Sequence, residues 1–101
     1  MKAVKVQYKV RPEYAEQNKA NIQKVMDRLK VDPIDGMLYS SYTLDDGQTF
    51  VHINIARDEQ TLSALSKVQE FNDFRMALKA SGPLEPPVST QLNPVAAGFT
   101  L

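Results

Sequence analysis

The chain has 101 residues, of which 43% are hydrophobic and 24% are charged, a composition that favours one folded domain over residues 1–101 and excludes intrinsic disorder. Twelve basic residues balance twelve acidic ones, so no excess positive charge favours binding to nucleic acid. The absence of cysteine excludes disulfides, thiolate metal sites and a cysteine nucleophile.

The first segment alternates in polarity. From Ala3 to Val10, valines and Tyr8 occupy one face and Lys5, Gln7 and Lys9 the other, a pattern typical of a β-strand. A signal peptide needs a continuous apolar run instead, and no stretch reaches membrane-spanning length. We therefore expect a cytoplasmic protein with no membrane partner.

The next segments predict a helix and then a hairpin. From about residue 12 to 30 the apolar residues fall at helical spacing, and Val31 to Gly36 then stops the helix and turns the chain. Met37 to Leu44 has strand character, and Asp46-Gly47 favours a tight turn into the strand at 49–56. Such a turn pairs Ser41 with His52 and Tyr39 with Asn54.

The strand at 49–56 carries two different rows of side chains. Val51, Ile53 and Ile55 form an apolar row, whereas Phe50, His52 and Asn54 form a mixed row on the other face. Asp58 is a good helix cap, and an apolar spacing of three predicts a bend or a short break near Lys67 to Gln69 in the helix that follows. That helix ends at 80–83, and a stiff connector at 84–87 leads to a last strand from Val88 to Leu101, at a sheet edge or as an arm onto a partner.

This order predicts an α+β, ferredoxin-like βαββαβ fold with a four-stranded antiparallel sheet whose first and third strands are central. Both helices would cover one face of the sheet. We expect the mixed row of Phe50, His52 and Asn54 on the bare face, together with Lys5, Gln7 and Lys9. A half-apolar bare face predicts a homodimer in which two sheets face each other.

The chain resembles the dimeric α/β barrel proteins, and among them the antibiotic biosynthesis monooxygenase-like group. The resemblance covers the whole chain in element order, and it depends on Phe50-Val51, Asp58-Glu59, Leu62, Phe71 and Phe74. It implies a cofactor-independent, monooxygenase-like protein that binds a small aromatic or apolar molecule. No cofactor is expected.

Three positions depart from that group. Ala56 stands where many members have tryptophan, Leu65 where they have histidine, and Val68-Gln69 where Ser-Pro is frequent. Haem-degrading relatives use an Asn, Trp and His set, which cannot be complete in a chain without tryptophan.

His52 is the candidate catalytic residue, because it is the one side chain that ordinarily titrates near neutrality. The alternative is a structural histidine, bonded across the strand or the dimer interface. Tyr39, Asn54 and Phe71 are candidate substrate-binding residues, although buried amides, phenols and phenylalanines more often serve the core. One histidine cannot make a metal site, and no phosphate-binding loop or serine hydrolase motif is present.

Two functions remain open at this point. The first is a small homodimeric barrel that binds an aromatic or apolar molecule between the sheet and the second helix, with oxygenation or isomerisation as the open chemistry. The second is a non-enzymatic dimeric ligand-binding or interaction module. A cavity of several hundred Å³ lined by His52 would favour the first.

Overall fold

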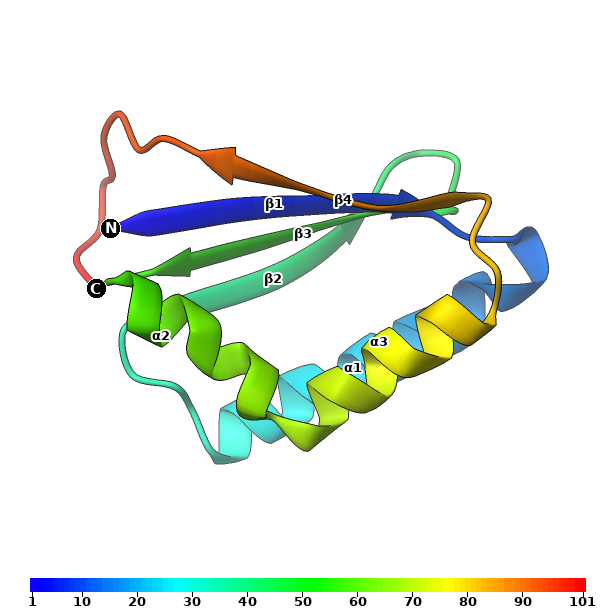
Figure 1. Ribbon diagram of the computed structural model, residues 1–101, viewed down its shortest axis with the longest axis horizontal. Helices are drawn as coiled ribbons and strands as arrows, with labels where there is room; N and C mark the ends of the chain where they lie inside the picture. Colours follow the sequence, from blue (N-terminus) through cyan, green and yellow to red (C-terminus); the bar gives the residue numbers. More distant parts are fainter.

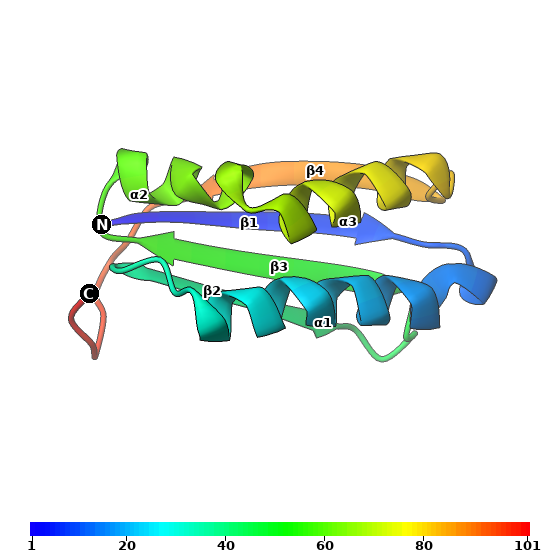
Figure 2. The same ribbon diagram turned by 90° about the horizontal axis from the view of Figure 1, so that it is seen from below.

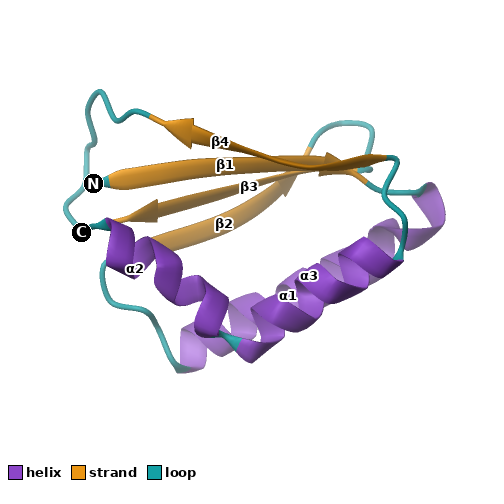
Figure 3. Cartoon of the chain, in the orientation of Figure 1, coloured by secondary structure: helices purple, strands orange, loops and turns teal.

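The computed structural model describes residues 1–101 as one sheet with helices on a single face (Figure 1 and Figure 3). The elements in chain order are β1 (Lys2–Lys9), the 3-10 turn η1 (Pro12–Tyr14), α1 (Ala15–Val31), β2 (Met37–Thr43), β3 (Thr49–Ala56), α2 (Glu59–Ser63), the 3-10 turn η2 (Ala64–Lys67), α3 (Gln69–Ala80) and β4 (Glu85–Leu92). None of the helices is both long enough and apolar enough to cross a lipid bilayer.

The sheet is antiparallel with strand order β2-β3-β1-β4, so β1 and β3 are central. In the view from the helix side, α1 lies over the β2–β3 half of the sheet and α2 with α3 over the β1–β4 half (Figure 2). The predicted ferredoxin-like fold, with its helices on one face, is therefore confirmed.

The hairpin between β2 and β3 has the predicted register but a longer loop. Ser41 faces His52 and Tyr39 faces Asn54. The chain turns through four residues, Asp45 to Gln48, and closes with a bond from the Leu44 amide to the Thr49 carbonyl. The Asp46 carboxylate accepts hydrogen bonds from the amides of Gln48 and Thr49 and from the Thr49 hydroxyl, which stabilises the wider loop. The register is unchanged because the loop is longer by one residue on each side.

The predicted break in the second helical segment is confirmed. Asp58 caps α2 by accepting the Thr61 amide at 2.7 Å. The chain then tightens into η2, and Val68 is extended, with φ −85° and ψ 120°, before α3 begins. Apolar residues three apart suit a 3-10 turn, in which positions i and i+3 eclipse.

The last strand is an edge strand, as predicted, but its bounds differ from the prediction. It begins at Glu85 and ends at Leu92, so the Pro86-Pro87 connector belongs to the strand, and residues 93–101 have no helix or strand. Its register against β1 shifts between Gln7 and Lys9, which accommodates two residues that cannot donate ladder hydrogen bonds.

The prediction for the faces of β3 is wrong. Tyr8 pairs with Phe50, Val6 with His52 and Val4 with Asn54, so each of these pairs shares a face. That face is the one under the helices, where Phe50 is 1% exposed and His52 is 4% exposed. The bare face instead carries Val51, Ile53 and Ile55 beside the predicted Lys5, Gln7 and Lys9. A histidine can occupy the covered layer because its ring nitrogens are hydrogen-bonded there.

The core lies between the sheet and the helices. Its buried hydrophobic members are Tyr8, Val10, Ala15, Ile22, Val25, Phe50, Phe74 and Leu78. Asn18 is fully buried among them on α1, at 0% exposure.

Candidate ligand pocket

A cavity of about 300 Å³ lies between the sheet and the segment α2–η2–α3. Thirteen residues line it, nine of them hydrophobic. All four sequence-predicted site residues, His52, Tyr39, Asn54 and Phe71, are among the thirteen. The register explains part of this, because Tyr39 and Asn54 are cross-strand partners and His52 lies two residues before Asn54 on the same face.

The His52 imidazole is held at both ring nitrogens. Nδ1 lies 2.7 Å from the Tyr39 hydroxyl, and Nε2 lies 2.8 Å from the Tyr8 hydroxyl. The Ser41 hydroxyl is a more distant neighbour of Nε2, at 3.4 Å. Burial lowers the pKa of His52 to about 4, because the charged ring would lose its hydration. At neutral pH the ring is therefore uncharged, with one nitrogen that donates and one that accepts.

Two residues of this network were not identified as site residues from the sequence. The sequence pattern places Tyr8 in the apolar row of the first strand, and it gives Asn18 no role in the site. Asn18 Nδ2 donates to the Tyr8 hydroxyl at 2.8 Å, so the network reaches from α1 to the cavity wall. The sequence did contain a signal: Asn18 falls at core spacing between Ala15 and Ile22, and a polar residue at a core position needs a partner.

Both tyrosines of the network stay protonated at neutral pH. Burial raises the pKa of Tyr8 and of Tyr39, because a phenolate loses its hydration in this environment. Each hydroxyl can therefore donate one hydrogen bond and also accept.

Aromatic rings surround the imidazole. Tyr8 stacks on Phe50 with ring centroids 5.5 Å apart, and Phe74 lies 5.4 Å from the His52 ring. Phe71 meets Tyr39 edge to face at 6.0 Å. At the exposed rim, the Arg75 guanidinium lies 4.7 Å from the centre of the Phe71 ring. The wall thus suits a flat apolar molecule, with a cation near the mouth.

Asn54 offers a polar group without an intramolecular partner. Its Oδ1 atom is buried and accepts no hydrogen bond within the chain. Buried side-chain oxygens are normally satisfied, and Asn18 Oδ1 is a second buried oxygen without a partner, so the packing leaves an unpaired acceptor at each of these two residues.

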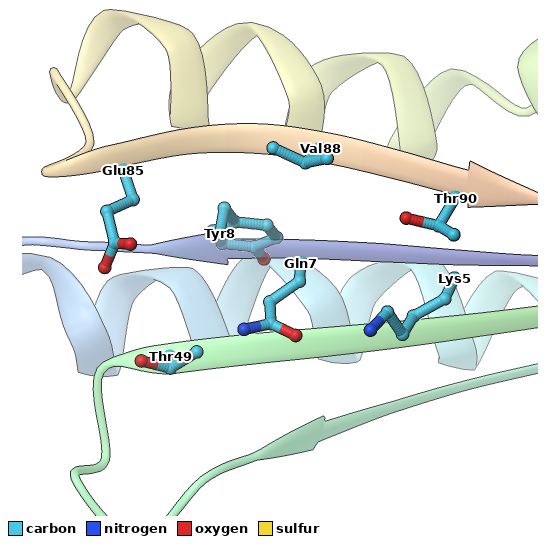
Figure 4. Close-up of a pocket in the computed structure, with 7 residues that line it drawn as sticks. All are labelled: Lys5, Gln7, Tyr8, Thr49, Glu85, Val88 and Thr90. Carbon is cyan, nitrogen blue, oxygen red and sulfur yellow. The ribbon is translucent and has the colours of Figure 1, made fainter.

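A second hollow, of about 210 Å³, lies on the bare face of the sheet. Figure 4 shows it with the helices behind the strands: Lys5, Gln7 and Thr90 stand over the sheet, whereas the Tyr8 ring lies behind β1. Its lining is mostly polar, with Val88 and Tyr8 as its two hydrophobic residues. It lacks the converging aromatic and polar groups of the first cavity.

No three side chains of His, Cys, Asp or Glu lie close enough together to bind a metal ion.

The fold has many counterparts among solved structures. Rv0793 from Mycobacterium tuberculosis is 19% identical, with a TM-score of 0.81 over 97% of this chain and 98% of its own. PA3566 from Pseudomonas aeruginosa is 20% identical, with a TM-score of 0.76 over 94% of each chain. A protein described as an antibiotic biosynthesis monooxygenase is 16% identical, with a TM-score of 0.80 over 95% of this chain and all of the other. The chain thus has the ferredoxin-like fold of antibiotic biosynthesis monooxygenase-like structures.

Comparisons by sequence add no closer relative. No family model matches the chain, and no curated protein matches it. The structural likeness therefore shows the fold alone.

Proposed function

We propose that the protein binds a small aromatic or apolar molecule in the cavity between the sheet and α2–η2–α3. The observation that supports this is a 300 Å³ space with a hydrophobic lining and a few converging polar groups. Ligand cavities run from roughly 300 to 1,000 Å³, so this one suits a molecule of one or two rings.

In this proposal the four predicted residues have distinct roles. Phe71 packs against the ring of the ligand, while Tyr39 and Asn54 contact its polar groups. His52 is the candidate catalytic group. Because both of its nitrogens are bonded to tyrosine hydroxyls, it would exchange a proton with the ligand through Tyr39 rather than directly.

A cofactor-independent, monooxygenase-like reaction is the proposed activity, since a structural neighbour is described as an antibiotic biosynthesis monooxygenase. The alternative is a non-enzymatic ligand-binding or interaction module, favoured by the saturated hydrogen bonding of His52. Incubation with 1-naphthol in air separates the two. A cofactor-independent monooxygenase converts 1-naphthol and one O₂ to 1,4-naphthoquinone and one water, so the substrate gains one oxygen atom and loses two hydrogen atoms, whereas a binding module returns 1-naphthol unchanged.

Ligand binding itself is tested by filling the cavity. Leu62 lines it from α2, so Leu62→Trp should occupy the space and weaken binding of 1-naphthol at least about tenfold in isothermal titration calorimetry. Met76→Trp is the matched control, because Met76 is 71% exposed on α3 and does not line the cavity. Equal affinities of wild type and Leu62→Trp would refute the proposed site.

We also propose that two copies associate through the bare face of the sheet. Large apolar side chains are exposed there: Leu38 is 49% exposed, Tyr42 57% and Val88 60%. Together with Val51, Ile53 and Ile55 they form an apolar surface that no helix covers. A second copy fits this surface, because a twofold axis places the same apolar patch on both sides and a net charge of zero adds no repulsion.

A further inference from the structure

The hydrogen bonds around His52 take their direction from the Asn18 amide, whose Nδ2 faces the Tyr8 oxygen and whose Oδ1 is buried without a partner. Asn18 Nδ2 donates to the Tyr8 oxygen. The hydroxyl proton of Tyr8, which is 2% exposed, then has one acceptor within reach, Nε2 of His52 at 2.8 Å. The opposite arrangement, with a proton on Nε2, would leave the Tyr8 hydroxyl proton buried without an acceptor.

The next step follows from the imidazole. A neutral ring carries one proton, so if Nε2 accepts from Tyr8, the proton is on Nδ1. Nδ1 lies 2.7 Å from the Tyr39 oxygen and donates to it. The low pKa of His52 supports a neutral ring at pH 7. Ser41, at 3.4 Å from Nε2, can only add a second, weaker donor to the same nitrogen in this arrangement.

The end of the chain of hydrogen bonds is the Tyr39 hydroxyl. Its oxygen accepts from His52, and its own proton has no acceptor within the protein. Tyr39 lines the cavity, so that proton is available to a ligand. Asn54, its cross-strand partner, supplies a buried acceptor oxygen in the same wall. The cavity thus presents one hydrogen-bond donor, the Tyr39 hydroxyl, whereas the Asn54 oxygen has no exposed surface.

We infer that Asn18 and Tyr8 are positioning residues that fix the His52 tautomer, so that Tyr39 donates into the cavity and selects ligands with an uncharged oxo group, such as a ketone. This inference rests on the proposed function, because it takes the cavity to be a ligand site. Beyond that function, it specifies that an oxo group of the ligand faces Tyr39, and that Asn18 and Tyr8 determine this preference.

The tautomer can be measured without any ligand. His52 is the only histidine, so protein labelled with ¹⁵N-histidine gives one imidazole ring in an NMR spectrum at pH 7. We expect a protonated Nδ1 and an unprotonated Nε2. A proton on Nε2, or on both nitrogens, would overturn the inference in the wild-type protein itself.

A pair of tyrosine variants shows whether Tyr8 fixes the tautomer. In Tyr8→Phe, Nε2 retains only the distant Ser41 hydroxyl, so a detectable fraction of the ring should move its proton to Nε2. Tyr14→Phe is the control, because Tyr14 also bonds an α1 asparagine, Asn21 at 3.3 Å, but does not touch His52. An unchanged tautomer in Tyr8→Phe, or an equal change in both variants, would show that Tyr8 does not set it.

Two ring compounds test the donor role of Tyr39. 1-Tetralone and tetralin share a carbon skeleton, and only the former has an oxo group. Wild type should bind 1-tetralone about tenfold more tightly than tetralin, and Tyr39→Phe should remove this preference. Equal binding to wild type would overturn the donor role. If neither compound binds, the proposed ligand site fails, while the nitrogen spectrum still decides the direction of the network.

Discussion

At the scale of single residues, the apolar core contains a row of polar side chains that are hydrogen-bonded to one another. Hydrogen bonds connect Asn18 on α1 to Tyr8, Tyr8 to His52, and His52 to Tyr39 at the cavity. The sequence could indicate His52 because it is the one histidine, and its register with Ser41 followed from the hairpin. The sequence did not indicate that Tyr8 and Asn18 belong to this network, since Tyr8 resembles an ordinary core residue and Asn18 is distant from His52 along the chain.

The buried imidazole predicts a loss of stability in weak acid. The folded-state pKa of about 4 lies below the ordinary value of 6.5, so between these values the unfolded chain binds the extra proton. Stability should therefore be constant above about pH 7 and fall by up to about 3 kcal/mol as pH approaches 4. Urea denaturation at half-unit steps of pH, analysed with linear extrapolation, measures the free energy of unfolding at each pH.

A matched variant isolates the histidine. His52→Gln cannot titrate, so its stability should be lower at pH 7 but nearly independent of pH between 5 and 7. Hydrogen bonds hold the pKa of three other side chains below its ordinary value, namely the carboxyl groups of Asp46, Asp58 and Glu70. They stabilise the fold above their unfolded pKa values and begin to lose that effect below about pH 5, outside the range of pH 5 to 7 in which the two proteins are compared. A parallel pH slope in both proteins would rule out His52 as the source.

At the scale of elements, the local sequence pattern predicts those features of the fold that depend on neighbouring residues. Apart from β4, whose bounds differ from the prediction, the positions of the strands and helices, the cap at Asp58 and the break before Gln69 follow from neighbouring residues. The local pattern does not determine which row of β3 faces the helices, because both rows contain apolar residues. The outcome depends on the side chains that β1 and the helices contribute to each face. Phe50 and the bonded His52 fill the covered layer, which leaves the β-branched row outside.

The covered side of β3 should carry the stability of the domain. Phe50 is 1% exposed and stacks on Tyr8, so Phe50→Ala should lower the free energy of unfolding by about 3 to 5 kcal/mol through a large cavity. Phe99→Ala is the same substitution at a side chain that is 44% exposed in the segment after β4, and it should change stability by less than about 0.5 kcal/mol. Chemical denaturation gives both values. Similar losses in the two variants would contradict the assignment of the faces.

At the scale of the whole molecule, the fold has one protected layer and one unprotected face. The helices bury the cavity and its polar network on one side, and the other side exposes apolar side chains of β2, β3 and β4 beside the polar row of β1. A domain of this size gains stability by covering such a surface. The sequence predicted a bare face and a facing copy but assigned the wrong row of β3 to it, so the proposed interface is more apolar than expected.

Placing a charge at the centre of that face should prevent association. Ile53 lies mid-strand on β3, beside Lys5 of β1 and Ser40 of β2. In Ile53→Lys, a dimer would have to bury two unpaired ammonium groups beside the existing lysines, so we expect the dimer dissociation constant to rise at least about thirtyfold, or about 2 kcal/mol. Met76→Lys adds the same charge to the outer side of α3, at a residue 71% exposed, and should leave the dimer intact. Light scattering after size-exclusion chromatography measures both, and circular dichroism checks that each variant is folded. A wild-type protein that is monomeric at micromolar concentration, or an Ile53→Lys protein that remains dimeric, would show that the bare face has another role.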